Sequence, residues 1–423
     1  MWDTLTKIYT HKDLRNKILF VLGILVLFRI LAHIPVPGID LNELRSFFER
    51  NQLFGLLNLF SGGTMRNFAI VMMGVGPYIT SSIIFQLLTM IVPSLESLQK
   101  EGEYGRQKIN QYTRLATIPL ALLQSYTMIV LLNRQGIIGS WSLFELVTML
   151  CTMTAGTILL MWLGELISEK GIGNGISLII TLGIISGVPT SIQQTLLVMD
   201  TTKLIGIIIF GLIALFVTAL IVFVNEGERQ VPVTYARRIR GHSTHGGVDT
   251  HLPIKVNIGG VIPIIFALSM MIFPGVIAKF FEQAKSPQIA QAAGFIVNLF
   301  EKNNVFYGVF YFVLVIAFTY FYASIVFKSD QIADNLQKQG GFVPGLRPGK
   351  ETADYLNTIL YRVTFIGAMF LGFIAVLPFV VQALTNVQTL VLGGTGLLIV
   401  VSVVIDTIRQ VKAQLVMRTY DQY

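Results

Sequence analysis

The sequence contains a single cysteine, Cys151, among 423 residues. One cysteine excludes an internal disulfide framework and a metal site built from several cysteines. Charged side chains are also scarce, since Asp, Glu, Lys and Arg make up only 13% of the chain. Soluble domains carry about a quarter charged residues, because charge keeps a surface hydrated. The composition therefore argues against a soluble protein.

Signatures of enzymatic chemistry are missing as well. The run GIGNG at Gly171–Gly175 lacks the spacing of a dinucleotide fingerprint, and no Walker A sequence or nucleophile–base pair occurs. His242, His245 and His251 lie close in sequence, but no carboxylate or cysteine set accompanies them at metal-binding spacing. We expect a protein that is not an enzyme, with no catalytic residue, metal or cofactor.

Long apolar runs dominate what is present. Hydrophobic residues form 53% of the chain and fall into blocks of about the length that crosses a bilayer as a helix. We therefore predict an all-α polytopic membrane protein with ten spans. They lie at about 18–34, 68–92, 113–132, 145–167, 175–197, 204–224, 257–281, 305–327, 360–381 and 388–405. No small-residue cleavage site precedes the first span, which favours a retained helix over a signal peptide.

Ten spans permit a division into two halves of five. The predicted parts are an N-terminal half at 1–190, an external hinge loop at 191–203 and a C-terminal half at 204–423. Inverted halves of this kind are common in transport folds. No sequence repeat accompanies the division.

The distribution of Lys and Arg predicts the orientation. One set of segments holds 22 of these residues, whereas the opposite set holds 8. The richer set comprises the N-terminus, the C-terminal tail, Lys170, and the loops between spans two and three, six and seven, and eight and nine. The positive-inside rule places that set, and so both termini, in the cytoplasm.

Two loops of the richer set are unusually long. They run from about Asn225 to Val256 and from about Lys328 to Ile359, and both are rich in Gly, Pro and Arg. Basic loops can serve only to orient a protein in the membrane, but orientation needs only a few charges close to the membrane. Excursions of this length tend to be functional or disordered. We interpret them as docking surfaces.

The centres of the spans are almost free of charge. Arg29, Glu145 and Glu165 lie toward span ends, where snorkelling explains them. The lack of a mid-membrane relay counts against an ion-coupled carrier. Uncharged polar residues inside spans either join helices or line a path or seam. They include Thr80, Gln86, Gln124 and Asn257.

The segment Leu56–Phe68, LLNLFSGGTMRNF, is unusual for a membrane helix. Ser61–Gly63 interrupts its apolar run, and it lies too close to the second span to cross independently. Non-helical backbone at membrane depth occurs where it lines a cavity or is buried in protein. A re-entrant piece closing a pore and a loop at the outer interface both fit.

Several motifs, taken in order, resemble one family. They are LFSGGTMRNF, GPYITSSIIFQLL, GIGNGIS, KVNIGGVIPIIFA, GGFVPGLRPGKETADYL and GGTGLLIVV. Together they are similar to the SecY family, whose members form the pore of the bacterial Sec protein-conducting channel. Gly241–Val248 departs from many relatives, which carry further basic residues there. The resemblance implies two five-helix halves around an hourglass pore.

The resemblance also implies site residues. The waist would be a ring of Ile79, Ile83, Ile176, Ile180, Ile265 and Ile399. The plug would span about 56–67, with Leu56, Leu57, Asn58, Leu59, Phe60, Ser61, Gly62, Gly63 and Thr64. Spans two and seven would form a lateral gate, with Thr80, Gln86 and Asn257 along its seam.

The implied function is conduction of unfolded secretory proteins across the bacterial plasma membrane, with lateral release of signal and transmembrane segments into lipid. Partners would be SecE, SecG, the SecA ATPase, the ribosome and signal-bearing precursors. Partner contacts would come from Arg237, Arg238, Arg240 and Arg347. The alternatives are a small-solute secondary transporter, which should carry a mid-membrane charged cluster, and an insertase without a pore.

Overall fold

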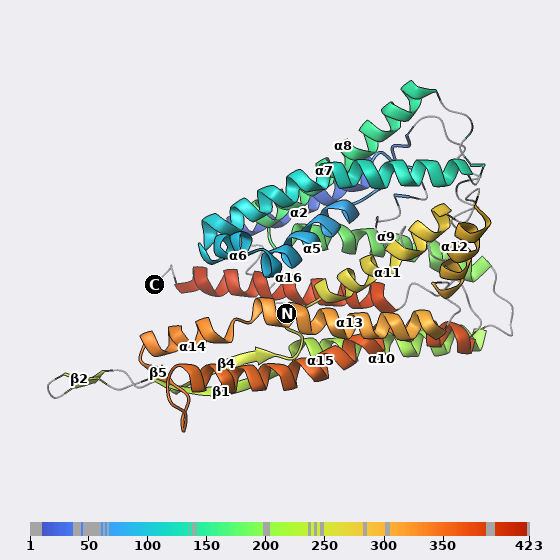
Figure 1. The fold of residues 1–423 in the computed structure, drawn as a ribbon. Coiled ribbons are helices and arrows are strands. Elements are labelled where there is room, and N and C mark those ends of the chain that lie inside the picture. The colour runs from blue at the N-terminus through green and yellow to red at the C-terminus, as the bar shows by residue number, and fades with distance from the viewer. Residues whose placement is uncertain are drawn as a thin grey trace. The chain divides into compact units, whose positions relative to one another are not determined.

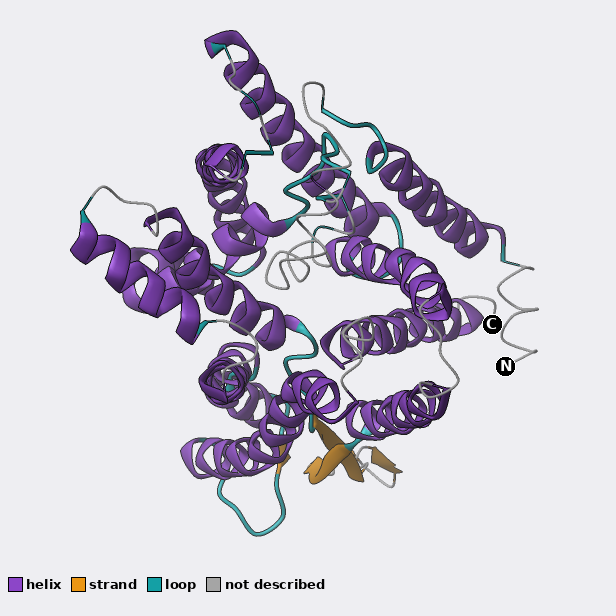
Figure 2. Cartoon of the chain, turned by 90° about the vertical axis from the view of Figure 1, so that its right-hand side faces the viewer, coloured by secondary structure: helices purple, strands orange, loops and turns teal. Residues whose placement is uncertain are grey.

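The computed structural model describes residues 11–36, 44, 61, 64–65, 67–134, 136–137, 139, 142–197, 204–235, 238–240, 243–245, 249–281, 286–300, 305–385 and 394–420. Helices dominate these residues, and strands are few (Figures 1 and 2). The helices are α2 (Lys12–Leu31), α5 (Gly76–Ile91), α6 (Pro93–Lys100), α7 (Glu103–Arg134), α8 (Leu143–Lys170), α9 (Gly175–Leu197), α10 (Leu204–Glu226), α11 (Ile262–Phe281), α12 (Pro287–Leu299), α13 (Val305–Val326), α14 (Ser329–Lys338), α15 (Lys350–Thr385) and α16 (Gly394–Tyr420).

Each of the ten expected spans overlaps one of these helices. Four helical stretches of the described residues are long and apolar enough to cross a membrane: Glu103–Asn133, Leu143–Lys170, Val305–Lys338 and Lys350–Leu377. α5 and α6 would make a fifth span if taken together, although they are bent by 98°. The protein is therefore a polytopic helical membrane protein, and the count of ten spans stays a prediction.

The second expected span begins later than predicted. Ala69 forms an isolated bridge with Pro35, residues 70–75 form turns, and the helix starts only at Gly76. Phe68 (φ 43°) and Gly74 (φ 58°) have left-handed backbone, which a continuous helix cannot contain. Pro77 in the first turn then favours a helix start.

The strands were not expected from the sequence. They are β1 (Glu228–Tyr235), β2 (Arg238–Arg240), β3 (Ser243–His245), β4 (Asp249–Lys255) and β5 (Gly341–Phe342). β4, β1 and β5 form one antiparallel sheet in that order, and β2 pairs with β3. In β1, buried Val231 and Val233 alternate with exposed neighbours, as the two-residue period of a strand requires.

Contacts divide the chain into two compact units. Unit 1 comprises Met1–Thr201, Ser269–Asn304 and Val403–Tyr423, and unit 2 comprises Thr202–Leu268 and Val305–Ser402. Two of the four boundaries between these segments fall inside helices, one within α11 and one within α16. The predicted halves at 1–190 and 204–423 remain a prediction.

Close backbone approach organises α8 and α9 in unit 1. A Cβ on Gly175 would lie 1.9 Å from the carbonyl oxygen of Gly164, so only glycine permits this contact. α5 is tied to α7 by the Ser81 hydroxyl, which donates to the carbonyl of Thr113 at 2.8 Å. These contacts fix the start of α9 against α8 and the second turn of α5 against α7.

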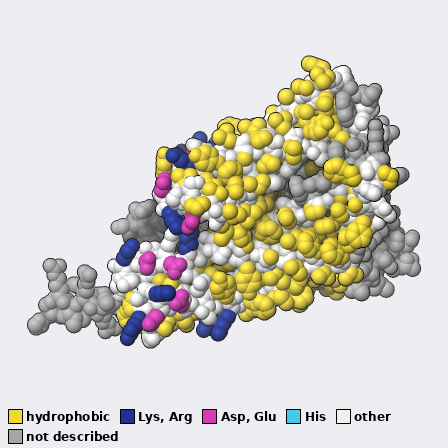
Figure 3. Space-filling view, viewed as in Figure 1, with side chains coloured by type: hydrophobic (Ala, Val, Ile, Leu, Met, Phe, Trp, Pro, Cys, Tyr) yellow, Lys and Arg dark blue, Asp and Glu magenta, His cyan; other side chains and the backbone are white. Residues whose placement is uncertain are grey.

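Aromatic packing joins α13 to α15 in unit 2. The ring centroids of Phe312 and Phe373 lie 5.4 Å apart, and those of Tyr307 and Phe379 lie 5.3 Å apart, both edge to face. Hydrophobic side chains cover the visible face of the helices, whereas charged side chains gather over α14 and the start of α15 (Figure 3). This contrast matches helices in lipid that end in an aqueous region.

Candidate functional site

The two long loops fold into one structure, which we call the loop body: β1, β4, β5, α14 and residues 343–349. Val231 and Ile254 of the first loop share a hydrophobic cluster with Val343 of the second loop and Leu356 of α15. All four are at most 3% exposed. The docking surfaces predicted as separate loops are thus parts of a single packed element.

Arg347 lies at an exposed turn of the loop body, between β5 and α15. Its backbone N–H donates to the Glu351 carboxylate at 3.3 Å, and its carbonyl accepts from the Thr352 hydroxyl at 2.8 Å. Gly345 (φ 86°) and Gly349 (φ 101°) supply the left-handed backbone of the turn on either side. The main chain of Arg347 is thus held while its guanidinium faces solvent.

The other predicted partner contacts are only partly described. Arg238 and Arg240 lie on β2, in register with His245 and Ser243 of β3. Arg237 lies outside the described residues.

Most of the predicted plug, Leu56–Phe60 with Gly62 and Gly63, also lies outside the described residues. Ser61 and Thr64 are described, and both are buried. The Thr64 hydroxyl is within hydrogen-bond distance of the carbonyl oxygens of Ser61 (2.8 Å) and Met72 (3.2 Å). These bonds hold the end of the predicted plug against the turns before α5.

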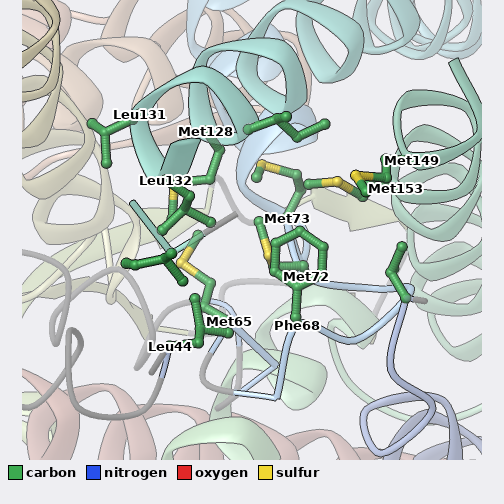
Figure 4. Close-up of a cluster of buried hydrophobic side chains, with 13 residues drawn as sticks. Leu44, Met65, Phe68, Met72, Met73, Met128, Leu131, Leu132, Met149 and Met153 are labelled. Carbon is green, nitrogen blue, oxygen red and sulfur yellow. The ribbon is translucent and has the colours of Figure 1, made fainter. Parts of the chain in front are cut away.

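Methionine is prominent in the core behind this segment, where Met65, Met72, Met73, Met128, Met149 and Met153 are buried together (Figure 4). Phe68 and Leu132 complete the centre of the cluster, each 0% exposed. Unbranched methionine fits irregular spaces and tolerates rearrangement.

The six predicted waist isoleucines fall into three groups. Ile79 and Ile83 are half-buried on α5, one turn apart. Ile176 and Ile180 are one turn apart on α9, with Ile180 only 1% exposed. In unit 2, Ile265 of α11 and Ile399 of α16 are both buried. Ring closure by all six remains a prediction.

The three residues predicted for the seam differ in their surroundings. Thr80 and Gln86 are half-buried on α5, where Thr80 bonds to the Gly76 carbonyl and Gln86 to Ser82. Asn257, which was expected inside the seventh span, instead lies before α11 in non-helical backbone. Its place follows from β4, which extends to Lys255 and delays the start of the helix.

Asn257 belongs to a polar chain that the sequence did not predict. Its Nδ2 donates to Oδ1 of Asn225 at 2.7 Å, and Asn225 Nδ2 donates to the Ser402 hydroxyl at 2.8 Å. The three residues are 6%, 8% and 2% exposed. In the sequence, the only sign of this polar chain was that Asn225 ends one apolar run and Asn257 begins the next.

Arg114 and Glu165 also form a pair that was missed. The Arg114 Nε lies 2.6 Å from Oε1 of Glu165, joining α7 to α8. Glu165 was expected to snorkel alone, but it has an ionic partner instead. Glu145, also expected to snorkel, completes a capping box with Ser142 at the start of α8.

Apolar helices and a folded loop body between them define a multi-pass helical membrane protein. A family model described as SecY matches residues 69–408. The protein translocase subunit SecY of Halalkalibacterium halodurans is 43% identical, covering 99% of both chains. The corresponding subunit of Mycobacterium bovis is 42% identical, covering 97% of both chains. The chain belongs to the SecY family.

Solved structures agree on the fold. One described as a protein conducting channel has a TM-score of 0.64 at 19% identity, covering 93% of this chain and 91% of that one. Sec61 in a canine ribosome–channel complex has a TM-score of 0.60 at 18% identity with the same coverage.

Proposed function

We propose that this chain is the pore-forming subunit of a bacterial Sec translocon. It conducts unfolded secretory proteins across the plasma membrane and releases signal and transmembrane segments laterally into lipid. The observation that carries the proposal is the 43% identity to a protein translocase subunit over 99% of both chains. The chain itself performs no covalent chemistry.

The waist consists of Ile79, Ile83, Ile176, Ile180, Ile265 and Ile399. β-Branched side chains have restricted χ1 angles, so a ring of them keeps its shape around a variable polypeptide. A ring without polar atoms excludes water when empty, and a dewetted constriction passes few ions. Residues 56–67 form a plug that seals this waist from the external side.

The lateral gate lies between α5 and α11. Thr80 and Gln86 on α5 support this assignment, because Oε1 of Gln86 is buried without a hydrogen-bond partner in the part of the chain that the structure describes. A seam with incompletely paired polar groups separates at lower cost than a fully apolar one. A signal sequence leaves the pore along it.

The loop body is the docking surface for the SecA ATPase and the ribosome, with Arg237, Arg238, Arg240 and Arg347 as contacts. The exposed guanidinium of Arg347 on a fixed backbone supports this role, since Arg binds carboxylates and phosphates through a planar fork. SecE clamps the two halves and SecG binds peripherally. Both termini and the loop body are cytoplasmic, as the distribution of Lys and Arg predicts.

A small-solute transporter is the less favoured alternative. Such carriers use charged or ion-coordinating groups at the midplane. Here Glu165 is paired with Arg114. The six positions of the proposed waist are all isoleucine, an apolar side chain suited to a seal.

Reconstitution tests the function directly. Proteoliposomes containing this chain and SecE, supplied with SecA, ATP and a signal-bearing precursor, should yield protease-protected precursor. Vesicles with SecE alone are the control. Absence of protected precursor in the complete system would refute the proposal.

A further inference from the structure

The sheet of the loop body ends directly at the buried polar chain in unit 2. β1 and β4 stay in register up to the pair Glu228 and Lys255. The next residues continue the pairing, because Val256 N–H donates to the Gly227 carbonyl at 2.9 Å. The Asn257–Asn225 amide bond of 2.7 Å then follows. The loop body and the amide pair are thus one continuous structure.

From Asn225 the chain of bonds reaches α16. The acceptor, Ser402, lies three residues after Ile399, so the two positions are neighbours on the helix surface. Asn257 lies eight residues before Ile265, at the entry to α11. Asn225, Asn257 and Ser402 therefore connect the loop body to the helices that carry both unit 2 waist residues.

The surroundings hold Asn257 tightly. α15 approaches so closely that a Cβ on Gly367 would lie 2.3 Å from the Val256 carbonyl oxygen. Yet the buried Oδ1 of Asn257 has no hydrogen-bond partner among the described residues. A buried amide oxygen without a partner raises the free energy of this arrangement, and hydration would relieve it. The packing therefore restrains Asn257, while the unpaired oxygen lowers the cost of moving Asn257 into contact with water.

We propose that Asn225, Asn257 and Ser402 form a polar latch that couples the loop body to the waist. The inference rests on the proposed channel function and deepens it. A partner that binds the loop body displaces β4, and Asn257 follows because it lies two residues beyond the strand. Loss of its bond to Asn225 frees the start of α11. Asn225 then holds the Ser402 turn of α16 without the support of Asn257, and the waist loosens.

The latch is tested by ion conductance per reconstituted complex, before and after SecA is added. Ser402→Ala removes the acceptor of Asn225 Nδ2 and should raise resting conductance about tenfold, equivalent to ~1.4 kcal/mol. SecA should then raise conductance by a smaller factor than in wild type, because the latch is already released. Ser402→Thr keeps the hydroxyl and should behave as wild type.

Two further variants distinguish a latch from a general loss of packing. Thr218→Val on α10 removes a hydroxyl that bonds within its own helix, to the Ala214 carbonyl, and should leave conductance unchanged. Asn257→Leu with Ser402→Ala should leak no more than the stronger single variant, because both break one chain. If the two contacts acted independently, their effects would multiply, and the double variant would raise resting conductance about a hundredfold.

Three results would overturn the latch: wild-type resting conductance in Ser402→Ala and Asn257→Leu, an unchanged response to SecA, or multiplying effects in the double variant. Each is scored in a preparation whose wild type yields protected precursor. Failure of that wild-type transport refutes the proposed function instead, so the two failures are distinguishable.

Discussion

Arg347 and Ile399 are the two single residues whose substitution best separates the proposed docking role from the proposed gating role. Arg347 is exposed on a backbone held by Glu351 and Thr352, so its charge can change without disturbing the fold. Ile399 is 1% exposed, so any polar replacement changes a buried apolar site. The two residues therefore test docking and gating separately.

Arg347→Glu should severely reduce precursor transport and weaken SecA binding by about tenfold or more, because repulsion replaces attraction at a docking surface. SecA affinity and protected precursor are the measurements. Lys338→Glu, at the exposed end of α14, makes the same charge change and should have a smaller effect. Normal transport by Arg347→Glu at normal abundance would exclude Arg347 from the docking surface.

Ile399→Asn should raise resting ion leak and admit precursors with defective signal sequences. An unpaired amide in the dry ring costs about 1–3 kcal/mol, whereas a wetted open pore hydrates it. About 1.4 kcal/mol shifts the open-to-closed ratio tenfold.

Val404→Asn is the matched control on α16, since Val404 is 44% exposed. That variant should lower abundance without leak. Unchanged leak and signal stringency in Ile399→Asn would remove this residue from the gate.

At the scale of elements, a glycine contact places α9, the helix that carries two of the proposed waist residues. α8 and α9 approach through Gly164 and Gly175, and Ile176 follows directly on that contact. The turns before α5 rest on the methionine cluster instead, which is more adaptable. Unit 1 thus combines a closely fitted glycine contact with a core rich in methionine.

Gly175→Ala should destabilise the purified complex by about 1–3 kcal/mol, because the added methyl group overpacks the contact with Gly164. Thermal unfolding in detergent measures the effect. Gly23→Ala on α2 is the control, since no atom lies within 4 Å of the added Cβ. Equal melting temperatures for the two variants would contradict the packing argument.

At the scale of the whole molecule, the loop body turns two distant loops into one surface. Val231 and Val343 belong to different loops but to one buried cluster, so both loops must lie on the same side of the membrane. The abundance of Lys and Arg in both predicts the cytoplasmic side.

Single cysteines at Thr250 and Gln339, in a Cys151→Ser background, should react with an impermeant thiol reagent in inverted vesicles and not in intact cells. Both positions are exposed. Gly341 would be a poor site, because its added Cβ would lie 2.9 Å from the Tyr235 ring. Labelling of both sites from outside intact cells would reverse the predicted topology.

The sequence by itself determined the class of protein, the family and the approximate place of the helices that overlap the expected spans. Hydropathy and short motifs are local properties, so apolar runs such as 175–197 predict helices without knowledge of their neighbours. Helix starts depend on less local features, and the left-handed backbone at Phe68 and Gly74 moved the start of α5 to Gly76.

Only the tertiary structure decided which polar groups are paired and which loops share a core. Asn225 and Ser402 are 177 positions apart, and Arg114 and Glu165 are 51 apart. Such contacts depend on the path of the chain, which periodicity does not encode. The energy of a buried amide depends on its partners, so the sequence showed Asn257 as one more polar residue in a seam. The fold made it the link between a loop and a helix.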